Sequence, residues 1–139
     1  MAYILSYRKS ITRDTTKMLN APEGSTELCT IDGITYVSIP SGAAIDSDQH
    51  AEVIGTMEVV TPDLELSEKI KAASPHVALI DKRVCERIAE SYSLTEEIKL
   101  LRTSPSPEFE AYNDYAEQCR QWGRDQKAAL GLFNQASAL

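Results

Sequence analysis

Asp46, Asp48 and His50 are the residues whose types and spacing come closest to a metal-binding pattern. They alternate along one segment, so their oxygen and nitrogen atoms could face a single cation. A calcium loop needs more oxygen ligands in a longer register and a bidentate carboxylate that closes it. The sequence that follows His50 supplies no such pattern. We therefore expect a solvated acidic loop, with no metal site and no cofactor.

The other candidates for catalysis are a histidine and two pairs of glutamates. His76 follows Ser74-Pro75 at an expected helix start, and the sequence places no Ser or Cys nucleophile beside it. Glu96-Glu97 and the pair Glu108 and Glu110 lie in the first turns of expected helices, where the helix dipole alone favours acidic residues. We expect no catalytic residue, no small-molecule substrate and no enzymatic activity.

Four aromatic residues near the C-terminus form the most ambiguous group: Phe109, Tyr112, Tyr115 and Trp122. Aromatic residues at helical spacing commonly form core, yet these occupy more than one face of a polar helix. Tyr and Trp are also favoured anchors of protein interfaces. We predict a partner-binding helix in which Tyr115 and Trp122 face the partner, while Phe109, Tyr112 and Cys119 pack inward.

The composition limits the classes of partner. The chain has 139 residues, 42% of them hydrophobic, and a net charge of −7, which suits one folded domain and disfavours autonomous nucleic-acid binding. Tyr7-Arg8-Lys9 is locally basic, and we interpret it as a solvated face. No signal peptide and no membrane-spanning segment are expected. The three cysteines are widely spaced and odd in number, which predicts buried thiols and synthesis in a reducing cytoplasm.

The N-terminal half predicts a small antiparallel β-sheet. Asp32-Gly33 lies between two β-prone runs, which predicts a hairpin over residues 28–39 with a two-residue type I′ turn. Its register would pair Ile31 with Ile34 and Cys29 with Tyr36 on one face, and Leu28 with Val37 on the other. A further strand is expected at Tyr3–Tyr7, although Ile11–Leu19 could equally be a short helix. Another strand is expected over about residues 51–60, with Gly55 as a bulge.

The C-terminal half predicts helices, each introduced by a start signal. The signals are Thr61-Pro62-Asp63, Ser74-Pro75, the capping box Ser93 to Glu96, and Ser104-Pro105-Ser106-Pro107. The fold class is therefore α+β. We expect a small α+β domain over residues 1–103 and, after a Ser-Pro hinge, an amphipathic helix over residues 107–131 that ends at Gly131.

The last third of the chain carries a family resemblance. Thr95–Arg102, then Pro105, then Ala111–Gly123 give the pattern EIKxLR … P … YNxYxExxRxWG. This pattern resembles the ends of small tailed-bacteriophage proteins encoded near tail-fibre or baseplate genes. The resemblance implies a virion structural component or an assembly factor, and it transfers no active-site residue.

Three functions remain open at this point. The preferred one is a non-enzymatic structural protein of the virion, made in the host cytoplasm, that acts as an adaptor, cap or decoration of the tail or its fibres. Such a protein would contact other virion proteins and form a homo-oligomer. The second is an assembly chaperone that is absent from the mature particle. The third is a small acidic inhibitor of a host enzyme.

Overall fold

The computed structural model describes residues 2–11 and 14–132, and it confirms the α+β class. Its contacts divide the chain into two compact units. Of the described residues, the sheet unit contains those up to 78 and those from 127 on, and the helical unit contains residues 79–126. The chain thus leaves the sheet unit to build the helical unit and then returns to it. The Ser-Pro segment at 104–107, expected to end a domain, lies inside the helical unit.

The sheet unit is built on a four-stranded antiparallel sheet with the order β4-β5-β1-β6. Its strands are β1 (Tyr3–Tyr7), β4 (Thr26–Ile31), β5 (Ile34–Ile39) and β6 (Glu58–Val60). Two further short strands, β2 (Ser10–Ile11) and β3 (Thr16–Lys17), pair with each other. Ile11, Thr16 and Lys17 of these strands fall in the segment for which a short helix was the alternative, and residues 12–13 lie outside the described residues.

The β4–β5 hairpin confirms the turn but corrects part of the register. Asp32 and Gly33 have φ of 51° and 79°, as a type I′ turn requires. Ile31 lies opposite Ile34, and Cys29 lies opposite Tyr36, as predicted. The predicted pairing of Leu28 with Val37 is wrong, because a bulge sets Glu27 opposite Val37. The bulge turns Leu28 to the face that carries Cys29, where it is buried.

The expected strand over residues 51–60 is wrong for its first half. Ala51–Ile54 forms a helical turn, α1, and only Glu58–Val60 pairs with β1. Gly55 is the helix C-cap at φ −66° and not a bulge. The turn forms because Val53 is completely buried against one face of the sheet. Tertiary packing here overrides the β-propensity of adjacent branched residues.

Both faces of the sheet are covered, as expected for strands with apolar residues on each side. On one face, Ile4 and Tyr36 pack with Ile70 of α2 (Leu64–Ala73) and Val77, the third residue of α3 (Pro75–Ser91). The opposite face carries a second cluster: Leu5, Tyr7, Val37, Ile39 and Val53. The alternation of these side chains along β1 and β5 follows the two-residue period of a strand.

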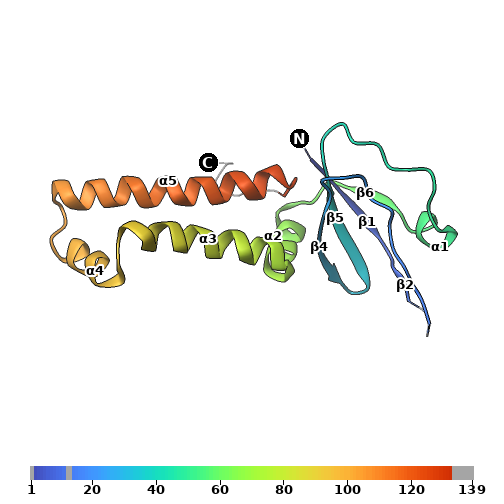
Figure 1. Ribbon diagram of the computed structural model, residues 1–139, viewed down its shortest axis with the longest axis horizontal. Helices are drawn as coiled ribbons and strands as arrows, with labels where there is room; N and C mark the ends of the chain where they lie inside the picture. The colour runs from blue at the N-terminus through green and yellow to red at the C-terminus, as the bar shows by residue number, and fades with distance from the viewer. Residues whose placement is uncertain (1, 12–13, 133–139) are drawn as a thin grey trace. The chain divides into compact units, whose positions relative to one another are not determined.

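The helical unit contains most of α3, together with α4 (Leu94–Arg102) and most of α5 (Pro107–Ala129). Figure 1 shows α3 and α5 side by side and running in opposite directions, with α4 in the connection between them. The predicted start signals are confirmed. Ser93 and Glu96 form a capping box, and the side-chain oxygen of Ser106 accepts from the Phe109 amide at 3.0 Å.

Candidate protein-binding surface of the helical unit

The helical unit is held together by an aromatic cluster centred on Tyr92, which lies between α3 and α4. The Tyr92 ring meets the Tyr112 ring edge to face, with centroids 5.0 Å apart, and lies 5.9 Å from the Tyr115 ring. Phe109 extends the cluster, with its ring 6.3 Å from that of Tyr112. Ile88 of α3 is buried in the same cluster. Such offset and edge contacts are favourable beyond the area they bury.

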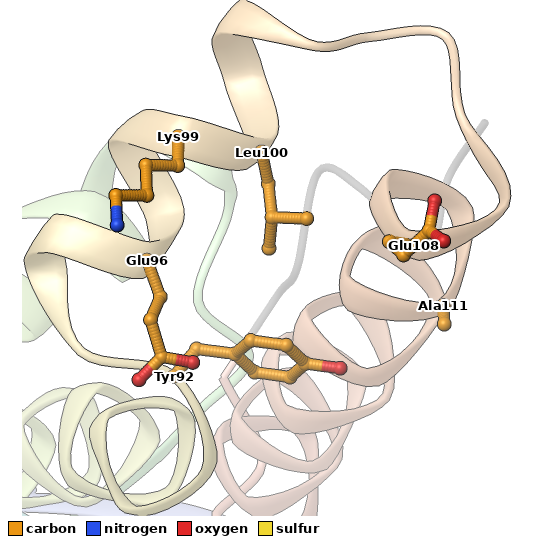
Figure 2. Close-up of a pocket in the computed structure, with 6 residues that line it drawn as sticks. All are labelled: Tyr92, Glu96, Lys99, Leu100, Glu108 and Ala111. Carbon is orange, nitrogen blue, oxygen red and sulfur yellow. The ribbon is translucent and has the colours of Figure 1, made fainter.

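A pocket of about 410 Å³ adjoins this cluster, between α4 and α5. Its lining residues are Tyr92, Glu96, Lys99, Leu100, Glu108 and Ala111. Figure 2 shows Leu100 pointing from α4 toward the Tyr92 ring, which extends toward α5. The Lys99 side chain runs along α4 away from α5. The pocket therefore has an aromatic and aliphatic floor with charged groups around it.

The chemistry of this pocket suits a side chain of another protein. Tyr92, Leu100 and Ala111 supply apolar contact. The Glu96 carboxylate is oriented, because it accepts a hydrogen bond from the Ser93 amide at 3.4 Å as part of the capping box. With Glu108 on α5, it gives the lining two carboxylates against the single ammonium of Lys99, which is directed away from α5. An apolar stem with a basic end, such as an Arg or Lys side chain, matches both properties.

The structure brings together three of the four predicted partner-binding residues. Phe109, Tyr112 and Tyr115 meet around Tyr92, whereas Trp122 lies outside that cluster. Tyr112 is buried, and Phe109, Tyr115 and Trp122 are half-buried. The inward positions predicted for Tyr112 and Cys119 are confirmed.

Tyr115 and Trp122 both contact Arg87 of α3. The Tyr115 hydroxyl donates to the Arg87 carbonyl at 2.9 Å, and the Arg87 guanidinium lies 3.8 Å from the centroid of the Trp122 ring. Stacking of a guanidinium on an indole is a favourable cation–π contact. Each ring therefore has one side occupied within the unit and some exposed surface remaining. Their role as partner-facing anchors stays a prediction.

Sequence reasoning missed Tyr92. The signal that could have found it is the spacing of Val84, Ile88 and Tyr92 at intervals of four residues, which continues the apolar stripe of α3 beyond its last turn. Tyr92 was not predicted as a core residue because it directly precedes the capping box at Ser93, where a new helix was expected to start.

Hydrogen bonds from Gln49 organise the acidic loop that contains Asp46, Asp48 and His50. The Gln49 side chain accepts from the Asn20 amide at 2.7 Å and donates to the Asn20 carbonyl at 2.8 Å. It also donates to the Asp46 carbonyl at 2.9 Å. These hydrogen bonds of Gln49 hold the loop that carries Asp46, Asp48 and His50. Across the described residues, no group of three or more His, Cys, Asp or Glu side chains is placed to hold a metal ion.

One ion pair joins β3 to α1, and the pKa of its carboxylate gives the direction of its pH dependence. The Lys17 ammonium donates to the Glu52 carboxylate at 2.6 Å, and this hydrogen bond holds the pKa of Glu52 below its ordinary value. Because the pKa is lower in the folded state, the contact stabilises the fold at neutral pH. That contribution is lost as the pH falls through the ordinary Glu range and the lowered folded value.

No protein-family model matches the chain, and neither the curated proteins nor the solved structures contain a match. Among the described residues, none of the helices has the length and apolar character needed to cross a bilayer.

Proposed function

We propose that this chain is a non-enzymatic structural protein of a tailed bacteriophage, which acts through protein–protein contacts as an adaptor, cap or decoration of the tail or its fibres. The observation that carries the proposal is the pocket between α4 and α5, with its aromatic floor and two carboxylates. The resembling segment, Thr95–Gly123, spans both walls of this pocket. Other virion proteins are the proposed partners, and the mature virion is the proposed location.

Mass spectrometry of purified particles tests the proposal. A structural component gives peptides at a stoichiometric level relative to known tail proteins. A chain that is abundant in infected lysate but missing from particles would instead be an assembly chaperone, which is the second candidate. Absence from particles therefore contradicts the structural role.

The pocket itself is tested by filling it. Ala111→Trp places a large ring at the pocket wall, whereas Asn113→Trp places the same ring on an exposed position of α5 outside the pocket. We expect Ala111→Trp to lower incorporation into particles while Asn113→Trp leaves it unchanged. Equal incorporation of both variants would show that the pocket is not the docking site.

The predicted anchors need a separate variant. Tyr115→Ala with Trp122→Ala removes both half-buried rings. Because both rings also make contacts within the unit, the melting temperature falls as well; if they face a partner, incorporation is lost even well below the melting temperature of the variant. A large loss of stability with normal incorporation would show that both rings serve only the fold of the helical unit.

A further inference from the structure

Helix α4 carries an apolar stripe that the rest of the described chain does not cover. Leu94, Ile98 and Leu101 are 73%, 44% and 61% exposed. Their spacings of four and three residues place them on one face of this nine-residue helix. Leu100 points elsewhere and packs against the aromatic cluster. The helix thus uses one side to join its own unit and leaves a second apolar side exposed.

Two opposite charges flank the stripe. Leu94 and Leu101 take the d positions of a heptad and Ile98 the a position, which puts Glu97 at g and Arg102 at e. Glu97 and Arg102 make no ion pair with any described residue. In a parallel helix pair, a g residue meets the e residue five positions later on the other helix. Glu97 and Arg102 have that separation.

We infer that α4 is a self-association surface, on which a second copy of this chain packs its own α4 in parallel. Leu94, Ile98 and Leu101 each meet the same residue of the other copy. Glu97 of each copy then faces Arg102 of the other, so two ion pairs close the two edges of the contact. The charge pattern selects the second copy as the occupant.

The antiparallel arrangement fits this pattern poorly. Antiparallel pairing sets a positions against d positions, so a d–a–d stripe leaves one leucine without a partner. It also places the Glu97 edge of one helix against the Glu97 edge of the other, where like charges repel. The apolar stripe and the two charges therefore both favour the parallel arrangement over the antiparallel one.

The contact is weak when it acts alone. Three side chains cover far less than the ~800 Å² per partner of a standard stable interface. It gains strength where many copies are held close together, because the second contact then becomes intramolecular. In this respect the inference deepens the proposed function, since a virion would supply that local concentration.

Cross-linking of the full chain tests the pairing and its direction. The exposed Cys85 is first replaced by Ser, which leaves the buried Cys29 and Cys119. Leu94→Cys should then form a dimer under mild oxidation at physiological salt, because parallel pairing brings the two copies of position 94 within disulfide range. Thr103→Cys is the matched control, since Thr103 is exposed, directly follows α4 and lies on the side away from the stripe. Equal yields from both variants would overturn the inference, and preferential linkage of Leu94→Cys to Leu101→Cys would overturn the parallel direction.

Charge reversal tests the ion pairs in the Leu94→Cys background. Glu97→Arg and Arg102→Glu should each lower the dimer yield about tenfold, because two attractions become two repulsions of similar size. An equimolar mixture of the two variants, or the double variant, should restore the yield. Unchanged yields for the single variants would refute the pairing. If the chain forms the cross-links but is absent from particles, the proposed function is wrong and this contact stands. If the chain is present in particles but forms no cross-links, this contact is wrong and the proposed function stands.

Discussion

At the scale of single residues, burial separates the three thiols into two classes. Cys29 and Cys119 are 8% and 6% exposed, as expected, whereas the expectation of a buried thiol is wrong for Cys85, which lies on the exposed side of α3. Burial also raises the pKa of the Cys29 thiol, and the nearby Glu27 carboxylate adds to the rise. Because the thiolate is the nucleophile, the raised pKa and the low solvent access of Cys29 both lower its reactivity.

We therefore expect only Cys85 to react rapidly with a thiol reagent in the native protein at pH 8. Cys29 and Cys119 should react on the timescale of unfolding, and denaturant should make all three equivalent. Peptide mapping after a short labelling pulse measures this, with Cys85→Ser as the control that removes the fast phase. Rapid native labelling of Cys29 would contradict its placement between the sheet and its covering helix.

At the scale of elements, the Asp32-Gly33 turn sets the β4–β5 hairpin. Gly33 has φ of 79°, where a β-branched residue is strained. Gly33→Val should lower the free energy of unfolding by roughly 1–3 kcal/mol. Gly55→Val is the control, because Gly55 has φ of −66° and its added Cβ would lie 3.7 Å from the nearest atom. Denaturant midpoints of the two variants measure the difference, and equal midpoints would refute the turn assignment.

The pairing of α3 with α5 depends on close approach at Gly123. A Cβ at this position would lie 2.6 Å from a methyl carbon of Val84, whose branched side chain has little freedom to move. Gly123→Ala should therefore destabilise the helical unit by about 1–2 kcal/mol, since overpacking exceeds the gain in helix propensity. The single tryptophan, Trp122, reports the unfolding of this unit.

A double variant separates the steric effect from a loss of backbone flexibility. With Val84→Ala in place, the contacting methyl is gone, and Gly123→Ala should become neutral or stabilising. The two substitutions are thus expected to be strongly non-additive. Additive free energies would mean that α3 and α5 do not approach each other at this point.

At the scale of the whole molecule, local signals were readable from the sequence and tertiary ones were not. Asp32-Gly33 and the Ser93 capping box act within a few residues, and both were predicted. The turn at Ala51–Ile54 was missed because the burial of Val53 against the sheet decides it. The bulge at Leu28 was missed for a similar reason. At the candidate site, spacing predicted the inward positions of Tyr112 and Cys119, but the contact of Arg87 with Trp122 joins two helices and leaves no local signature.

The end of the described chain packs into the sheet unit. After α5, Leu130 accepts a hydrogen bond from the Ser38 hydroxyl at 2.8 Å, and Leu132 is buried in the cluster that contains Ile4. Gly131 allows this turn, because it has φ of 91° and a Cβ there would lie 2.9 Å from the Ala2 carbonyl oxygen. The sheet unit therefore depends on residues that follow the whole helical unit in the sequence.

Leu132→Ala should destabilise the sheet unit by about 2–5 kcal/mol, the range for deletion of a buried leucine side chain. Leu79→Ala is the matched control, because Leu79 is 42% exposed and should cost much less. Hydrogen exchange of the β1 and β5 amides, read residue by residue, reports the sheet directly. Faster exchange there in Leu132→Ala than in Leu79→Ala would support the closure of the unit by its C-terminal segment. Equal exchange would mean that the segment contributes nothing to the stability of the sheet, and that its burial follows from the fold without supporting it.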